Sequence, residues 1–142
     1  MKVVLDTNVV VSAFLSPAGK PAAILELVLR RYLNICFSTA ILAEYEQVLS
    51  RSKFAGKVQL EAVQRFFGLL REFGIMTISG LSKTKMPDET DRIFYDAAKA
   101  AGAILVTGNK KHYPNEPFIK DPAEFVGEGR EREEGLYFQT EG

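Results

Sequence analysis

Acidic and polar side chains stand at four separate points of this chain, each next to an apolar run or at an expected helix start. They are Asp6, Thr7, Asn8, Glu44, Asp88, Asp91, Thr107, Gly108 and Asn109. The carboxyl ends of parallel strands share one edge of a sheet, where side chains from distant segments can meet. Carboxylates that met there would repel one another unless a cation neutralised them. Because hard oxygen ligands suit Mg²⁺ and Mn²⁺, the pattern predicts a site for one of these ions.

Each carboxylate taken alone has a simpler explanation. Asp6 could cap a turn, Asp88 or Asp91 could be ordinary acids at a helix start, and Glu44 could be a solvated helix residue. The prediction of a metal site therefore depends on the combination. His112 is the only histidine, which argues against a nitrogen-rich transition-metal site.

Composition restricts the class of protein. The length of 142 residues fits one domain, and 46% apolar with 25% charged residues is far from the disordered and membrane classes. The single cysteine, Cys36, excludes a disulfide within the chain and a cysteine zinc cluster. The apolar run at residues 3–5 is too short for a signal peptide or a membrane span. We therefore expect a cytoplasmic protein without a membrane partner.

Short apolar runs alternate with helical patterns along the chain. The expected strands are 3–5, 35–37, 75–78, 103–106 and 118–120, and residues 6–20 are expected to form a connection. Helices are expected from Pro21 to about Leu33, from Thr39 onward, through the amphipathic segment 63–73, and from Pro87 to Ala101. This alternation predicts an α/β fold, a three-layer α/β/α sandwich around a mainly parallel sheet of four to five strands.

The C-terminal segment 127–142 differs from the rest. It contains five glutamates against two arginines, and residues 134–139 resemble a one-residue variant of a protease recognition site used in protein expression. We expect a domain at 1–126 followed by a flexible tail at 127–142, in part of foreign origin.

Four segments together resemble the motifs of the PIN domain in their order and spacing. They are Leu5 to Val10, Ala43 to Tyr45 with residues 49–54 after it, Pro87 to Asp91, and Leu105 to Asn109. The likeness covers residues 1–126 and is strongest to the toxin components of bacterial or archaeal toxin-antitoxin pairs. It implies a Mg²⁺- or Mn²⁺-dependent endoribonuclease, in which water activated by the cation attacks an RNA phosphodiester.

The resemblance also implies residue roles. Asp6, Glu44 and Asp91 would be metal ligands and catalytic residues, with Asp88 and Asn109 as further candidate ligands. Thr7, Asn8 and Thr107 would orient ligands and waters. Asn109 departs from the family pattern, because many members carry an aspartate there, and this puts a strict two-metal mechanism in doubt.

Basic residues flank the motifs and are candidates for phosphate contacts, with scattered surface charge as the alternative: Arg51, Lys53, Lys110, Lys111 and His112. Tyr45 and Tyr113 could stack on a base, although burial is favoured for Tyr45. The partners implied are RNA, an antitoxin that covers or enters the acidic pocket, and further copies of the chain in a homodimer or larger homo-oligomer.

Two alternatives remain open at this point. The domain could bind RNA or a protein without cleaving, an interpretation favoured by Asn109. An aspartate after the first strand also occurs in phosphatases and phospho-accepting receiver domains. The phosphatase pattern expects a second aspartate where Asn8 stands, and no lysine follows Thr107 in the receiver manner, so this alternative is the weaker one.

Overall fold

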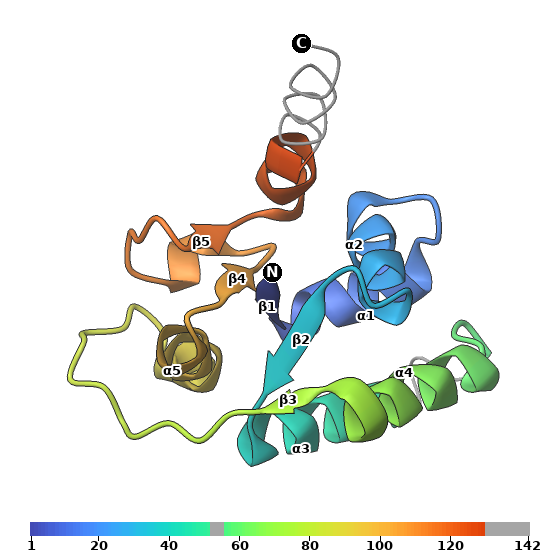
Figure 1. The fold of residues 1–142 in the computed structure, drawn as a ribbon, viewed down its shortest axis with the longest axis horizontal. Helices are drawn as coiled ribbons and strands as arrows, with labels where there is room; N and C mark the ends of the chain where they lie inside the picture. Colours follow the sequence, from blue (N-terminus) through green and yellow to red (C-terminus); the bar gives the residue numbers. More distant parts are fainter. Residues whose placement is uncertain (52–55, 130–142) are drawn as a thin grey trace, which may run out of the picture.

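The computed structural model describes residues 1–51 and 56–129. Its centre is a five-stranded sheet in the order β3-β2-β1-β4-β5, and every pair of neighbours is parallel. The strands are β1 (Lys2–Leu5), β2 (Asn34–Phe37), β3 (Ile75–Met76), β4 (Ile104–Val106) and β5 (Ile119–Lys120). The first strand of the chain is thus the middle strand of the sheet, and the predicted α/β fold is confirmed (Figure 1).

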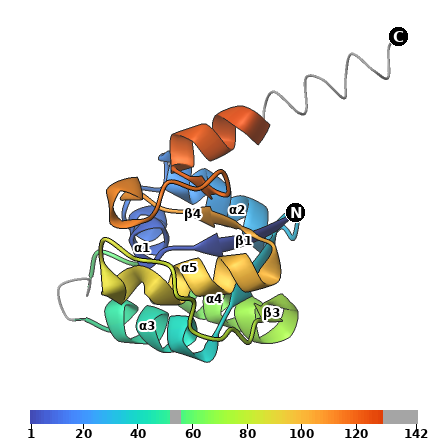
Figure 2. The ribbon, with the colours of Figure 1, turned by 90° about the vertical axis from the view of Figure 1, so that its left-hand side faces the viewer.

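Helices cover both faces of this sheet. They are α1 (Thr7–Leu15), α2 (Lys20–Leu29), α3 (Thr39–Leu49), α4 (Leu60–Phe73) and α5 (Arg92–Ala101), with 3₁₀ turns η2 (Glu89–Asp91) and η3 (Lys110–His112). In Figure 1, α1 and α2 lie on one side of β1 and α5 lies on the other. Figure 2 is turned so that the α5 side faces the viewer. This is the three-layer arrangement expected of right-handed crossovers whose direction reverses at β3.

The core explains why the strands are continuously apolar. Val3, Val4 and Leu5 of β1 are fully buried, as expected when both faces of a parallel sheet are covered. On α4, Phe66 and Leu70 are buried, in agreement with the predicted amphipathic pattern. The Phe66 ring lies 5.7 Å from the Tyr45 ring between centroids, so α4 and α3 share one core.

The prediction of a connection between β1 and Pro21 was wrong, because α1 occupies most of it. Val9, Val10 and Ala13 of this helix are buried, and the Asp6 side chain caps its N-terminus. Three consecutive valines, residues 9–11, have modest helix propensity. The helix is stabilised by burial of one face rather than by propensity, which local sequence does not reveal.

Element boundaries also differ in places. The helix that starts near Pro21 ends at Leu29 rather than near Leu33, and β3 stops at Met76, leaving Ile78 93% exposed. The last helix runs over residues 122–129, past the predicted domain boundary at 126, with Lys120 paired to Glu128 at 2.8 Å. The protease-like segment 134–139 lies outside the described residues.

In the described part of the chain, no single helix has the length and apolarity of a membrane span. Only the bent pair Thr7–Leu15 and Lys20–Leu29, which meet at 100°, reaches that length and composition together.

Candidate metal centre

Asp6 stands at the carboxyl end of the central strand and caps α1. It is 5% exposed. Its Oδ2 accepts hydrogen bonds from Thr107 Oγ1 at 2.9 Å and from the Tyr113 hydroxyl at 2.7 Å, and its Oδ1 accepts from Asn8 N at 3.3 Å. A buried carboxylate with three donors stays in one orientation. The fold therefore holds Asp6 rigidly at the edge where β1 and β4 end.

Glu44 reaches the same edge from α3. Its Oε2 accepts a hydrogen bond from the hydroxyl of Thr7, the first residue of α1. The neighbouring Tyr45 is fully buried and donates its hydroxyl to Leu5 O, so the prediction of burial for Tyr45 is confirmed. Burial raises the pKa of Tyr45, and the carboxylates of Asp6 and Glu44 raise it further. Two hydrogen bonds therefore join the motif on α3, which contains Glu44 and Tyr45, to the motif at the end of β1, which contains Leu5 and Thr7.

The last motif meets the first through Asn8 and Thr107. Asn8 Oδ1 accepts from Gly108 N at 3.1 Å, and Thr107 Oγ1 accepts from Asn109 N at 3.0 Å while donating to Asp6. A side chain at Gly108 would bring its Cβ within 3.5 Å of Asn8 Oδ1. Thr7 and Thr107 thus donate to Glu44 and Asp6 through their hydroxyls, whereas the Asn8 side chain binds Gly108 and its backbone N–H donates to Asp6. Asn109 is exposed and takes part through its backbone N–H.

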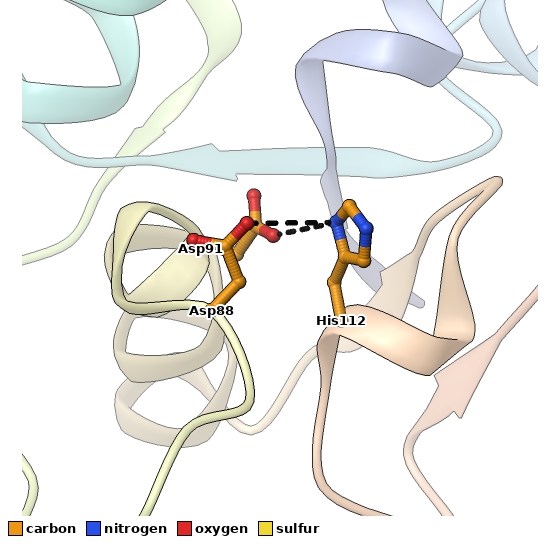
Figure 3. Close-up of side chains that lie close together, drawn as sticks. All are labelled: Asp88, Asp91 and His112. Atoms are coloured by element: carbon orange, nitrogen blue, oxygen red, sulfur yellow. Dashed lines mark hydrogen bonds and ion pairs between the residues drawn. The ribbon is translucent and has the colours of Figure 1, made fainter.

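A second acidic group faces this edge from η2 and the start of α5. Figure 3 shows Asp88 and Asp91 opposite the imidazole of His112, which belongs to η3. His112 Nδ1 lies 3.1 Å from Asp91 Oδ2 and 3.9 Å from Asp88 Oδ2. One ligand atom from each of the three residues falls within 4.8 Å of the other two. Such a group has the spacing of a cation site.

Electrostatics distinguish the two aspartates of this group. Burial raises the pKa of Asp91 to about 6, and the carboxylates of Asp6 and Asp88 add to the rise against the opposing effect of His112. The pKa of Asp88 is lowered instead, mainly because Thr90 donates to it from both its hydroxyl and its backbone N–H. Of these two carboxyls, Asp91 is therefore the one whose ionisation is less favourable in the absence of a cation.

His112 and Tyr113 connect the two acidic groups. His112 contacts Asp91, and the next residue, Tyr113, contacts Asp6. Burial raises the pKa of Tyr113, followed by the effects of the carboxylates of Asp6, Asp91 and Glu44. The predicted catalytic residues from three distant segments thus lie within electrostatic range of one tyrosine.

The sequence interpretation missed this role of Tyr113. It is 4% exposed and bonded to Asp6, so the suggestion that it stacks on a base was wrong. His112 was expected at phosphates and instead pairs with Asp91. The available signal was that both residues closely follow Thr107, a residue already assigned to the site.

The predicted RNA-contacting residues have different surroundings. Lys110 pairs with Glu124 at 2.9 Å, and this bond is the main reason that the pKa of Glu124 falls to about 2. Arg51 and Lys111 are exposed. Lys53 lies outside the described residues. The cationic side chain of Lys110 is thus already engaged within the protein.

The residues present fit a divalent cation. Carboxylates are ligands of Mg²⁺ and Mn²⁺, and an imidazole nitrogen is accepted more readily by transition ions, so Mn²⁺ suits Asp88, Asp91 and His112 better than Mg²⁺. The raised pKa of Asp91 points the same way, because a bound cation would offset the repulsion from Asp6 and Asp88.

Comparisons with known proteins agree with the fold. A family model described as PIN domain matches residues 2–111. The uncharacterized protein MJ1680 of Methanocaldococcus jannaschii is 31% identical over 113 residues, which cover 78% of this chain and 72% of that protein.

Two solved structures are similar in fold. The crystal structure of VapBC2 from Rickettsia felis, bound to a DNA fragment from the promoter, matches with a TM-score of 0.53 and 23% identity, over 85% of this chain and 97% of that chain. PAE2754 from Pyrobaculum aerophilum matches with a TM-score of 0.55 and 16% identity, over 89% and 87% of the two chains.

Proposed function

The chain belongs to the PIN domain family, and from this premise we propose that it is a metal-dependent endoribonuclease, the toxin of a toxin-antitoxin pair. One observation carries the proposal. Carboxylates from three segments far apart in sequence lie at one edge of the sheet: Asp6 accepts from Tyr113, Asp91 lies 3.1 Å from the adjoining His112, and Glu44 accepts from Thr7, the residue after Asp6. Such a concentration of acidic groups is costly for a fold and is expected where a cation has to be held.

In this proposal Asp6, Glu44 and Asp91 are the catalytic ligands, and Asp88 and His112 complete the binding group on the η2 side. A bound Mg²⁺ or Mn²⁺ would activate water and offset the negative charge that develops on the scissile phosphate. Asn109 offers an amide oxygen at most, which contributes no charge. A second cation would therefore be held more weakly than in family members that carry an aspartate at this position.

The remaining polar residues keep the carboxylates in place. Thr107 and Tyr113 donate to Asp6, and Thr7 donates to Glu44, so these two predicted ligands are oriented before substrate arrives. The raised pKa of Tyr113 keeps its proton on the hydroxyl. Tyr113 is therefore a donor that orients Asp6 and does not act as a general base.

Substrate and partners follow from charge and from the family. Exposed Arg51 and Lys111 follow the second and fourth motifs in the chain and would contact the RNA backbone. An antitoxin would cover or enter the acidic pocket, and the likeness to a VapBC2 structure supports such a partner. We also propose assembly of the chain into a homodimer or larger homo-oligomer.

The test is cleavage of a mixed single-stranded RNA pool with Mn²⁺, Mg²⁺ or a chelator. Wild type is compared with Asp6→Asn, which keeps the size of the side chain, and with Glu26→Gln on the exposed surface of α2 as the control. We expect cleavage that requires metal, is lost in Asp6→Asn and persists in Glu26→Gln. Cleavage in chelator, or equal cleavage by Asp6→Asn, would contradict the proposal.

The second candidate function is a non-catalytic module that binds RNA or protein. Asn109 favours it, since the position lacks the carboxylate that many family members carry there. Metal-independent RNA binding without cleavage, unaffected by Asp6→Asn, would identify this function instead.

A further inference from the structure

The segment 77–86, which we call the strap, connects β3 to the turn that carries Asp88 and Asp91. It has no regular secondary structure, and its Ile78 and Leu81 are 93% and 87% exposed. Its one buried apolar residue is Met86, which is 6% exposed and belongs to the core, so residues 77–85 bury little apolar surface and are expected to open easily. Asp88 lies two residues after the strap, so its position depends on Met86 and on the hydrogen bonds that fasten the rest of the strap to the domain.

Arg92, the first residue of α5, makes three of the hydrogen bonds described for the strap. Its Nη1 donates to Ser82 O and Ser82 Oγ, both at 2.8 Å, and its Nη2 donates to Thr84 O at 2.7 Å. The same guanidinium donates from Nε and Nη2 to the two carboxylate oxygens of Glu89 in η2, at 2.6 and 2.8 Å. The five N–H groups of the side chain thus have five acceptors.

Ser82 is held from a second point on α5. Its backbone N–H donates to Asp96 Oδ2 at 3.3 Å. Asp96 is 6% exposed, and its Oδ1 is buried without a hydrogen-bond partner among residues 1–51 and 56–129. Release of the strap would remove the described hydrogen bond of a buried carboxylate, which is unfavourable. Both the N–H and the C=O of Ser82 are therefore bound by α5.

These contacts connect Arg92 to the segments that carry Asp88 and Asp91. It follows Asp91 in the chain, it binds Glu89 next to Asp88, and it binds the strap that leads to Asp88. Its side chain is 13% exposed, and its donors are already used, so it is not available to a substrate phosphate. Arg92 thus binds η2 and the strap, the two segments next to Asp88, and leaves no donor for a ligand.

On the basis of the proposed function, we propose that Arg92 is a positioning residue that fixes Asp88 relative to Asp91 and His112 by fastening the strap and η2 to α5. Lysine cannot replace it, because an ammonium group has three donors and no planar fork to bind Glu89 and the two strap carbonyls at once. Partners that orient metal ligands typically contribute a factor of about 10 to 100 in metal affinity.

The first test needs no metal and no substrate. Amide hydrogen exchange of the full chain is followed by NMR in wild type, Arg92→Lys and Ser82→Ala, with Arg30→Lys on exposed α2 as the matched control. We expect faster exchange at the Ser82 and Thr90 amides in Arg92→Lys, a smaller change in the same direction in Ser82→Ala, and none in Arg30→Lys. Thr90 reports on the site because its N–H donates to Asp88 Oδ1.

The second test titrates Mn²⁺ into the same proteins. We expect the dissociation constant to rise about tenfold in Arg92→Lys, less in Ser82→Ala, and not at all in Arg30→Lys. Unchanged exchange and unchanged Mn²⁺ affinity in a folded Arg92→Lys protein would overturn the positioning role, as would a wild type that binds no Mn²⁺. If wild type binds Mn²⁺ with the predicted dependence on Arg92 but cleaves no RNA, the proposed function fails and the positioning role stands.

Discussion

The two sides of the candidate metal centre are built differently. On the strand-end side, Asp6 is 5% exposed and both of its oxygens accept hydrogen bonds from other elements. On the η2 side, Asp88 and His112 have side chains that are 40% and 47% exposed, and one histidine faces both aspartates. The first side is held by the core of the domain and the second by contacts near the surface.

Because of this difference, we expect the strand-end side to contribute mainly to the stability of the fold and the η2 side to the dependence on cation and pH. Removing a donor on the strand-end side leaves a buried charge with fewer partners, which costs stability. On the η2 side, burial and then the carboxylates of Asp6 and Asp88 disfavour the ionised form of Asp91, and a proton or a cation can relieve this. We therefore expect substitutions on the first side to affect both folding and activity, and those on the second to affect mainly the dependence on cation and pH.

The largest effect is expected for Glu44→Gln. The substitution removes the charge of a proposed ligand, and Gln can still accept the hydrogen bond from Thr7. We expect RNA cleavage in Mn²⁺ to fall by about 100-fold or more. Single-turnover rates are compared with those of Glu26→Gln, the same substitution on an exposed helix position. A folded Glu44→Gln protein with the wild-type rate would remove Glu44 from the site.

Tyr113→Phe tests the rigidity of the strand-end side. It removes one of two donors to the buried Asp6 Oδ2 while leaving the ring in place. We expect the free energy of unfolding in urea to fall by about 1 to 3 kcal/mol. Tyr32→Phe, at a position that is 70% exposed, is the control and is expected to have no effect. Equal stability of the two variants would show that Asp6 does not need this donor.

Competition between protons and Mn²⁺ for the Asp91 carboxylate tests the η2 side. Asp91 has a raised pKa of about 6, so below that pH its carboxyl holds a proton that a cation has to displace. Mn²⁺ affinity is therefore expected to be steady above about pH 7 and to fall toward tenfold per pH unit below 6. Calorimetry between pH 5 and 8, run beside Asp91→Asn, checks this. A pH dependence that persists unchanged in the variant would assign it to another group.

The smallest effect concerns two neighbouring lysines. Lys110 is engaged by Glu124, whereas Lys111 is exposed. We expect Lys111→Gln to weaken RNA binding in chelator more than Lys110→Gln, and to lower the slope of log affinity against log salt by about 1. Fluorescence anisotropy at several salt concentrations measures both. A larger loss from Lys110→Gln would mean that RNA displaces Glu124.

Parts of this architecture are visible in the sequence for physical reasons. Strands covered on both faces must be apolar throughout, so the strands at Val3 to Leu5 and Ala103 to Val106 can be recognised in the sequence. The parallel sheet follows from the alternation of such strands with helices. Asp6 follows β1 and Asp91 precedes α5, and such element ends of a parallel sheet are where polar side chains meet, whereas Glu44 lies within α3. The position of these carboxylates was therefore predictable in outline, and their role as metal ligands stays a prediction.

The contacts that define the site were not predictable from spacing. The bonds from His112 to Asp91 and from Tyr113 to Asp6 join residues 21 and 107 positions apart, and they require the sheet order to bring η3 beside β1. Helix α1 was missed because its valines favour strands locally and burial decides otherwise. The strap contacts of Arg92 likewise depend on tertiary placement.

The most direct test of the account is whether the two sides form one cation site. The Mn²⁺ dissociation constant is measured by calorimetry for wild type, Asp6→Asn, Asp91→Asn and the surface control Glu26→Gln. We expect the dissociation constant to rise about tenfold or more in both Asp6→Asn and Asp91→Asn and to stay unchanged in Glu26→Gln. A folded Asp6→Asn protein that binds Mn²⁺ as tightly as wild type would contradict the claim that Asp6 and Asp91 share one metal centre.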